Sequence, residues 1–181
     1  MNEHLKIVFN QILPTITDSG ILYWVYGGVG YATFAGEFYR GNKDVDLFVL
    51  EEDFESVQKI IEDFSALNNG KVCISFLPSG RPKIDVFING KETLSVMPVY
   101  KTDTGIVFKS HEGEKTYPLE VLAQEKRILG TYEFFTPKDE FIKSLFIDYL
   151  ESKKGKYPDK KKRVEDAKRL LTAEEFKKYF L

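Results

Sequence analysis

The sequence predicts an α/β fold, in which a small mixed β-sheet is flanked by helices and followed by a C-terminal helical segment. Three observations carry this prediction. Short apolar runs rich in β-branched and aromatic residues recur over the first 115 residues, and amphipathic helical patterns alternate with them. Composition then changes near Pro118, and helical periodicity dominates. We therefore expect an α/β core over residues 1–115 and a C-terminal helical region over residues 116–181.

The composition is that of a folded globular chain. Of the 181 residues, 43% are hydrophobic, with 15 Phe and 10 Tyr, so a packed core is expected and disorder is not. Cys73 is the only cysteine, which excludes an intrachain disulfide and a cysteine-based zinc cluster and favours a reducing, cytoplasmic setting. The acidic N-terminus does not resemble a signal peptide. Residues 21–39 hold a single charge, but their central glycines favour a strand, a turn and a helix over a membrane span.

Helices and strands are expected to alternate over the first half of the chain. Apolar residues at helical spacing predict a first helix, which Pro14 is expected to end. A β-branched and aromatic run then ends at Tyr26, where glycines turn the chain into a short helix. Asn68 to Gly70 suit a helix C-cap. The expected order is a helix over residues 3–13, a strand over 21–26, a helix over 31–38, a turn at 41–42, a strand over 45–50 and a helix over 52–67.

Strands followed by helices are expected over the second half. Asn89 and Gly90 signal a tight hairpin, because both residue types tolerate positive φ. Pro98 is expected to limit the strand after this hairpin. The strands are expected over residues 72–77, 83–88, 93–97 and 105–109. The helices are expected over residues 119–129, 137–150, 163–171 and 173–181.

Three aspartates and a glycine pair form the candidate site. Asp44 and Asp46 stand at the start of a strand, where residues i and i+2 project from the same face. Asp85 lies within the apolar strand KIDVFI, where a carboxylate is costly to bury unless it is hydrogen-bonded, paired or bound to metal. Gly27 and Gly28 close the preceding apolar strand, and such a turn lets phosphates approach the backbone. Carboxylates that face one way are what magnesium-dependent phosphoryl transfer requires.

This arrangement resembles the minimal nucleotidyltransferases of the DNA polymerase β superfamily. Their motif is a strand ending in Gly-Gly or Gly-Ser, a short helix, an Asp-x-Asp strand and a third acid on a later strand. Gly27 and Gly28 match the glycine pair. Asp44 and Asp46 match the Asp-x-Asp, with the spacing of the lincosamide-type antibiotic nucleotidyltransferases, and Asp85 matches the third acid. The firm resemblance covers residues 23–50 and 82–88 and is loose elsewhere.

The resemblance implies a metal-dependent enzyme that moves a nucleoside monophosphate from an NTP, such as ATP, to an acceptor hydroxyl. Asp44 and Asp46 would hold two Mg²⁺ ions that bridge the triphosphate. Asp85 would ligate the ion nearest the acceptor and could take the proton of its hydroxyl. The resemblance also implies a phosphate-binding lysine on a helix around residue 126. The nucleotide-binding residues would be Gly27, Gly28, Arg40, Lys43 and Lys126.

Charge is unevenly distributed along the chain. Residues 1–150 carry 15 Lys+Arg against 22 Asp+Glu, whereas residues 151–181 carry 11 against 6. Most of the basic excess lies between Ser152 and Arg169, which is either a solvated helix face with a lysine-rich loop or a contact for a polyanion such as RNA. The acceptor therefore stays open between a small molecule, such as an antibiotic, and the RNA or protein acceptors of toxin-type relatives.

Two other functions compete with this interpretation. Residues 28–33 are a near miss to the dinucleotide fingerprint GxGxxG, but Thr33 replaces the last glycine and the acids stand at the start of the next strand. Alternatively, the chain could bind a nucleotide without transferring it, as a regulatory module. The complete set of three aspartates argues against that alternative.

Overall fold

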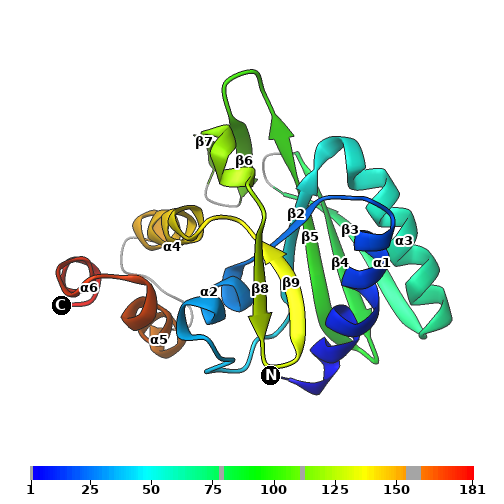
Figure 1. The fold of residues 1–181 in the computed structure, drawn as a ribbon, viewed down its shortest axis with the longest axis horizontal. Coiled ribbons are helices and arrows are strands. Elements are labelled where there is room, and N and C mark those ends of the chain that lie inside the picture. Colours follow the sequence, from blue (N-terminus) through cyan, green and yellow to red (C-terminus); the bar gives the residue numbers. More distant parts are fainter. Residues whose placement is uncertain (1, 78–79, 111–112, 154–159) are drawn as a thin grey trace.

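A computed structural model describes residues 2–77, 80–110, 113–153 and 160–181 of the chain. A central β-sheet has helices against both faces, and the C-terminal helices gather beside it (Figure 1). This mixed α/β architecture is the fold class that the sequence predicts.

The elements follow one another in the expected alternation, and their bounds are as follows. The strands are β1 (Tyr23–Tyr26), β2 (Val45–Leu50), β3 (Gly70–Phe76), β4 (Pro82–Ile88), β5 (Lys91–Lys101), β6 (Ile106–Ser110), β7 (Gly113–Tyr117), β8 (Glu125–Leu129) and β9 (Tyr132–Thr136). The α-helices are α1 (Leu13–Asp18), α2 (Gly27–Ala35), α3 (Phe54–Leu67), α4 (Asp139–Lys153), α5 (Lys160–Leu170) and α6 (Ala173–Phe180). Short 3₁₀ or π turns are η1 (Glu3–Leu5), η2 (Val8–Ile12), η3 (Glu51–Asp53) and η4 (Leu119–Leu122).

The sheet is mixed, as predicted. Its strand order is β1-β2-β5-β4-β3, and β6 and β7 extend it from the far end of β5. Strands β2 and β5 run parallel, and the remaining pairs of described strands run antiparallel. The predicted hairpin between β4 and β5 is confirmed, with φ of 52° at Asn89 and 73° at Gly90.

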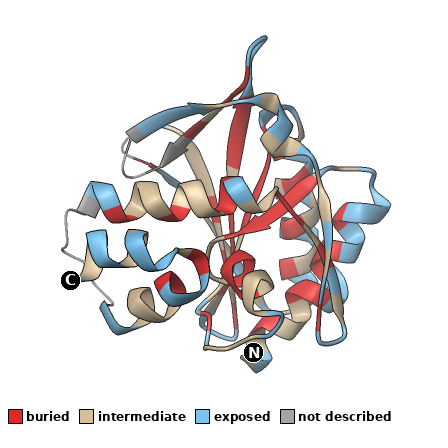
Figure 2. Ribbon diagram, turned by 60° about the vertical axis from the view of Figure 1, so that its left-hand side comes forward, coloured by how far each residue is buried: buried red, intermediate tan, exposed pale blue. Residues whose placement is uncertain are grey.

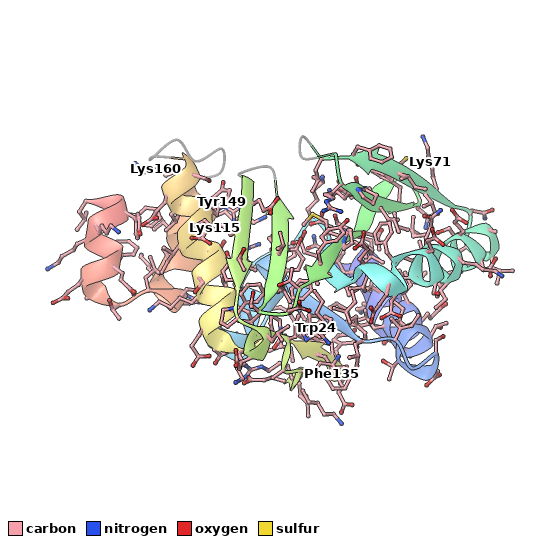
Figure 3. All side chains as sticks on the ribbon, turned by 90° about the horizontal axis from the view of Figure 1, so that it is seen from above. Trp24, Lys71, Lys115, Phe135, Tyr149 and Lys160 are labelled. Carbon is pink, nitrogen blue, oxygen red and sulfur yellow. The ribbon has the colours of Figure 1, made fainter. Side chains whose placement is uncertain are left out.

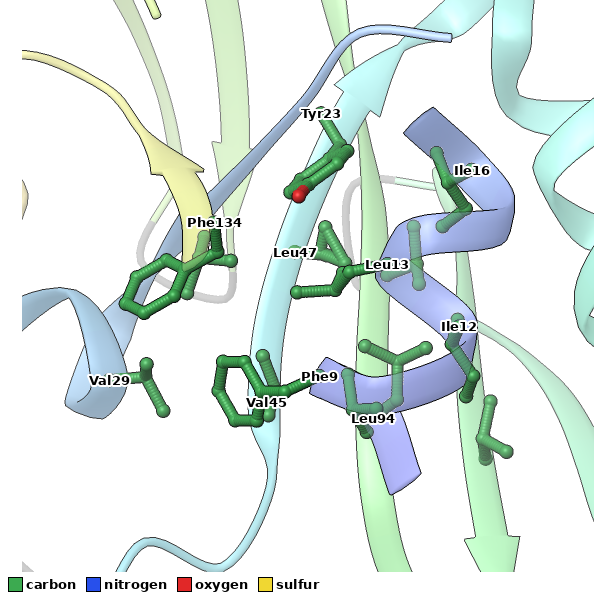
Figure 4. Close-up of a cluster of buried hydrophobic side chains, with 14 of the residues drawn as sticks. Phe9, Ile12, Leu13, Ile16, Tyr23, Val29, Val45, Leu47, Leu94 and Phe134 are labelled. Carbon is green, nitrogen blue, oxygen red and sulfur yellow. The ribbon is translucent and has the colours of Figure 1, made fainter. Parts of the chain in front are cut away.

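Side chains that alternate along the central strands feed two separate cores. On one face of the sheet, Val25, Leu47 and Leu94 pack with η2, α1, α3 and Phe134 of β9 (Figure 4). On the other face, aromatic residues of β1, β2 and β6 pack against Phe141 of α4. Figure 2 shows this burial concentrated along the central strands, with the outer faces of the helices exposed.

The register of the sheet determines where the predicted acids lie. Asp46 of β2 is level with Ser95 of β5, and Ser95 is level with Asp85 of β4. Leu47 and Leu94 belong to the first core, so their neighbours in sequence project from the opposite face. The acids therefore share the face of the sheet that α1 and α3 leave free, and Ser95 lies between them.

Three predicted element boundaries are wrong. Pro14 does not end the first helix, because the π turn of η2 bonds the N–H of Leu13 to the carbonyl of Val8 and Pro14 then enters the first turn of α1. Helix α2 begins at Gly27, so the glycine pair forms its first turn. Strand β5 runs through Pro98 to Lys101, since β4 pairs with it only as far as Val96 and leaves that edge of Pro98 unpaired.

The helix predicted over residues 119–129 is also wrong. This segment forms η4 and then the hairpin of β8 and β9, turning at Gly130 with φ of 63°. The side chains of Leu129 and Phe134 enter the first core, while Ile128 is 67% exposed. Period-two alternation around a glycine turn is a hairpin pattern, so the signal was present in the sequence. Residues 116–138 therefore contain a 3₁₀ turn and a β-hairpin but no α-helix, and the C-terminal α-helices begin with α4.

The C-terminal helices form a third core with α2. Tyr31 of α2 packs against Ile142 and Phe146 of α4 and against Ala167 of α5. In the part of the chain that the structure describes, no helix is both long enough and apolar enough to cross a membrane.

Candidate active site

A cavity of about 570 Å³ lies between the acid-bearing face of the sheet and helices α2, α4 and α5. Its volume is in the range of roughly 300–1,000 Å³ that is usual for ligand sites. The cavity brings together most of the predicted site residues: Gly27, Gly28, Arg40, Lys43, Asp44 and Asp46. Asp85 and Lys126 are not among the residues that line it.

The glycine pair allows the first turn of α2 to contact the acids. Gly27 has φ of 59°, and a Cβ atom built on it would lie 2.1 Å from Oδ2 of Asp46. A Cβ atom on Gly28 would lie 2.4 Å from Oδ1 of Asn42. Both positions therefore require glycine for close packing. The first turn of α2, whose N–H groups have no partner within the helix, lines the cavity beside Asp46.

Asp44 and Asp46 are two carboxylates with no cation of their own. Neither forms an ion pair with any residue in the described part of the chain. Burial raises the pKa of Asp46 to about 7, and the charge of Asp44 adds to the shift. Burial also raises the pKa of Asp44, together with its close contact to the carboxyl of Glu92. Two adjacent carboxylates that lack a counter-charge fit a divalent cation with oxygen ligands, such as Mg²⁺.

Asp85 differs from this pair because it already has partners. Its Oδ1 lies 2.7 Å from Nζ of Lys83 and accepts a hydrogen bond of 3.1 Å from Oγ of Ser95. The expectation that a carboxylate in this strand must be paired is met by these two side chains. Among the described residues, no group of three His, Cys, Asp or Glu side chains is arranged to hold one ion.

Arg40 anchors the segment that leads to Asp44. Its Nε and Nη2 donate to the two carboxylate oxygens of Asp166 on α5, at 2.6 and 3.1 Å, and its Nη1 donates to Oδ1 of Asn42. Asp166 is fully buried and also accepts from the hydroxyl of Tyr39 and from Nη1 of Arg163. Arg40 therefore lines the cavity with its charge already compensated, and the network ties the loop before β2 to α5.

The other predicted lysines lie in different surroundings. Lys43 lines the cavity, is mostly exposed and is ion-paired with Glu92. Lys126 lies on β8 and not on a helix, and its Nζ is 2.7 Å from Glu133 of β9. Lys126 is therefore paired across the hairpin and is not among the residues that line the cavity.

Helix α5 contributes cations that sequence analysis did not assign to the site. Lys162 and Arg163 line the cavity, and Lys162 forms no ion pair with any described residue. Burial lowers the pKa of Lys162, and the nearby charges of Arg40 and Arg163 add to this effect. Part of the basic segment that the sequence singles out, residues 154–159, lies outside the described residues. The cavity thus has an acidic wall on β2 and a basic wall on α5.

A scan of family models finds no match to the chain, and neither does a search of curated protein sequences. Solved structures do match. The antibiotic-resistance factor ANT(2'')-Ia is 17% identical, with a TM-score of 0.66 over 99% of this chain and 90% of its own. The lincosamide antibiotic adenylyltransferase LnuA is 16% identical, with a TM-score of 0.63 over 94% and 98%. A putative nucleotidyltransferase from Thermotoga maritima is 15% identical, with a TM-score of 0.58 over 84% and 88%. The chain has the nucleotidyltransferase fold.

On this nucleotidyltransferase fold, a further wall of the cavity escaped sequence analysis. It consists of Tyr117 of β7 with Asp148 and Tyr149 of α4, and Asp148 is bonded to the hydroxyl of Tyr117 and to Lys115. Figure 3 shows Lys115 and Tyr149 together at one end of the sheet, with Lys71 at the other end. These residues are separated by long stretches of sequence, so no local pattern marks them as one surface.

Proposed function

We propose that this protein transfers a nucleoside monophosphate from an NTP to a hydroxyl acceptor. One observation carries the proposal: two carboxylates without a counter-ion, Asp44 and Asp46, face the unpaired ammonium of Lys162 across a single cavity. A nucleotide triphosphate with a bound divalent cation needs both walls, because the cation binds carboxylates and the phosphates bind donors. The nucleotidyltransferase fold supports the same conclusion.

Each wall has a defined part in holding the donor nucleotide. The N–H groups that open α2 at Gly27 and Gly28 would donate to phosphate oxygens. Asn42 is 3% exposed, and its Nδ2 has no hydrogen-bond partner in the structure, so it is a further donor at the same wall. Lys162 would supply a positive charge opposite, and Lys43 could exchange Glu92 for a phosphate at the cavity's edge.

The reaction would be an in-line displacement at the α-phosphorus. A bond forms from the acceptor oxygen to phosphorus, the bond from phosphorus to the bridging oxygen breaks, and pyrophosphate leaves. The proton of the hydroxyl needs a base. Asp85 lies on the same face, two strands from Asp46, and does not line the cavity, so it would take this proton through an intervening water. A cation held by Asp44 and Asp46, when bound, would neutralise charge on the phosphates. The N–H groups at the start of α2 and the ammonium of Lys162 would orient the triphosphate for attack by the acceptor hydroxyl.

A small hydroxylated molecule fits the third wall as acceptor. Tyr117 and Tyr149 offer aromatic surface, and Asp148, which accepts a hydrogen bond from the hydroxyl of Tyr117, adds a hydrogen-bond acceptor to the same wall. Two solved structures with this fold are described with bound antibiotics, LnuA with lincomycin and ANT(2'')-Ia with adenylyl-2''-tobramycin. RNA stays a second acceptor class, because α5 presents Lys160, Lys161 and Lys162 in a basic depression next to the cavity.

Label transfer tests the proposal. The protein is incubated with Mg²⁺ and each α-labelled NTP, with total RNA or with a pool of hydroxylated antibiotics, and the Asp44→Asn variant serves as control. We expect label on one acceptor pool, and loss of that label in the variant. Retention of full activity in Asp44→Asn would contradict the proposal. Tight nucleotide binding without transfer to either pool would instead support a regulatory nucleotide-binding module.

Gly27→Ala is expected to reduce transfer at least about 100-fold, since a misplacement of about 1 Å at a reacting centre has that effect. The new Cβ would displace the carboxylate of Asp46, which lies 2.1 Å from its position. Gly36→Ala is the matched control, because Gly36 also has positive φ, 68°, but has no atom within 4 Å of its Cβ position. Steady-state transfer rates compare the two. Equal losses of transfer activity in both variants would show that Gly27 is needed only for its positive φ and not for its contact with Asp46.

A further inference from the structure

The carboxylates at the site outnumber the cations that neutralise them by two. Four acids cluster near the start of β2: Asp44, Asp46, Asp85 and Glu92. The ammonium of Lys43 is paired with Glu92, and the ammonium of Lys83 is paired with Asp85 at 2.7 Å. Asp44 and Asp46 remain, and among the described residues neither has an ion-pair partner. The nearby cations Lys162 and Arg163 lie on α5, across the cavity from this pair. Asp44 and Asp46 are therefore the two carboxylates left to hold a single divalent cation.

Lys83 is placed to act as an internal cation. It lies two residues before Asp85 on β4, so both side chains project from the same face of the sheet. Their side chains are only 21% and 17% exposed, which favours a maintained pair over a pair dispersed by solvent. Ser95 holds the same oxygen of Asp85 with a hydrogen bond of 3.1 Å. The positive charge of Lys83 also acts on Asp44 and Asp46, so it extends over the whole cluster.

The position of Asp85 separates it from the other two acids. Asp46 and Asp85 are two strands apart with Ser95 between them, which puts their Cα atoms roughly 10 Å from each other. Asp85 does not line the cavity that Asp44 and Asp46 line. An ion held by Asp44 and Asp46 therefore has no need of Asp85, and the place beside Asp85 already holds an ammonium group.

We infer that the protein takes one divalent cation, at Asp44 and Asp46, and that the ammonium of Lys83 replaces a second ion at Asp85. This inference rests on the proposed function and differs from the two ions that the family resemblance implies. Lys83 is a positioning residue here, because its ammonium and the hydroxyl of Ser95 hold the carboxylate of Asp85 in place on the acid-bearing face of the sheet.

Counting bound Mn²⁺ tests the inference without any turnover. Equilibrium dialysis of the full chain, with and without a non-transferable NTP analogue, gives ions bound per protein, and the analogue alone is dialysed to subtract the ion that it carries itself. We expect one protein-held ion in the wild type. We expect a second ion in Lys83→Met, bound at least tenfold more tightly than any second ion in the wild type, because removing the ammonium leaves Asp85 unpaired.

Three variants make the count specific. Lys83→Arg retains the positive charge and should keep the count at one. Lys71→Met, which removes an exposed lysine of the neighbouring strand β3, should also keep it at one. The double variant Lys83→Met with Asp85→Asn should return the count to one. Two protein-held ions of similar affinity in the wild type would overturn the inference, even if label transfer succeeded. A count of one protein-held ion in both the wild type and Lys83→Met would show that the ammonium of Lys83 does not take the place of a second ion.

The count and the transfer assay fail separately. A protein that transfers label and holds two ions keeps the proposed function and loses the inference. A protein that holds one ion but neither binds an NTP analogue nor transfers label loses the proposed function, and with it the catalytic meaning of the count.

Discussion

Asp46→Asn is expected to abolish nucleotidyl transfer and, at the same time, to make the metal-free protein more stable above neutral pH. The loss of transfer should be at least about 1,000-fold, since the cation would lose one of its two carboxylates and several kcal/mol of charge stabilisation with it. The gain in stability follows from the position of Asp46, whose half-buried carboxyl lies beside Asp44 without an ion-pair partner among the described residues.

The sign and the pH range of the stability effect follow from the raised pKa. The pKa of Asp46 is about 7 in the folded protein and about 3.9 in an unfolded chain. Between these values the folded state holds a proton that the unfolded state releases, so the carboxyl destabilises the fold increasingly as pH rises from about 4 to 7. The full effect, on the order of 2–4 kcal/mol, is present above pH 7 and absent below about pH 4.

Thermal unfolding in EDTA measures this effect. Asp46→Asn should melt several degrees above the wild type at pH 8, and the two proteins should melt together near pH 4. Asp85→Asn is the control, because Asp85 is paired with Lys83 and its removal should give no gain at pH 8. A wild type that is more stable than Asp46→Asn at pH 8 would show that another group neutralises Asp46 in solution.

Asp166→Ala is expected to destabilise the protein by about 3–5 kcal/mol, which is the usual cost of removing one partner from a buried ion pair. The side chain of Asp166 is fully buried, and that of Arg40 is 7% exposed. Truncation would leave the guanidinium of Arg40 and the hydroxyl of Tyr39 without their acceptor inside the protein. The segment that carries Asp44 would lose its attachment to α5, so transfer should fall even at temperatures where the variant is folded.

Urea unfolding of the wild type and of Asp166→Ala gives the two free energies of unfolding, and mass spectrometry of the intact chains confirms that each sample is the full-length protein. Glu165→Ala is the matched variant, because Glu165 is the adjacent acid on α5 and forms no ion pair with a described residue. It should change stability by no more than about 0.5 kcal/mol. Equal effects of the two substitutions would show that Asp166 contributes only as part of the helix, and not through Arg40.

The sequence predicts much of the fold because its local patterns are consistent. The strand β2, the helix α3 and the hairpin at Asn89 follow from apolar spacing and turn chemistry alone. The hairpin at Gly130 was not predicted, because the family resemblance implies a helix around Lys126 whereas the residues on either side of the glycine alternate as in two strands. Local pattern and family analogy conflicted there, and the local pattern was the better guide.

The site was predictable only as far as its residues are close in sequence. Asp44 immediately precedes β2 and Asp46 is its second residue, so the pleat of an extended chain predicted that both face the same way. The attachment of Arg40 to Asp166 crosses 126 residues, and the wall formed by Tyr117 and Asp148 depends on how β7 meets α4. Such contacts come from tertiary packing, and no spacing rule along the chain indicates them.

The contact between Arg40 and Asp166 also bears on the order in which the protein folds. Closing a loop of 126 residues costs more chain entropy than forming the hairpin of β4 and β5, whose turn spans two residues. We therefore expect the sheet to form first and the segment 39–44 to settle late. Pulse-labelled hydrogen exchange would then show amides of β4 and β5 protected before those of residues 39–44, and the reverse order would contradict this. A nascent or refolding chain would pass through a state in which Asp46 and Asp85 already lie in the sheet, while the segment that carries Asp44 has not yet settled against α5. The proposed cation site is incomplete in that state.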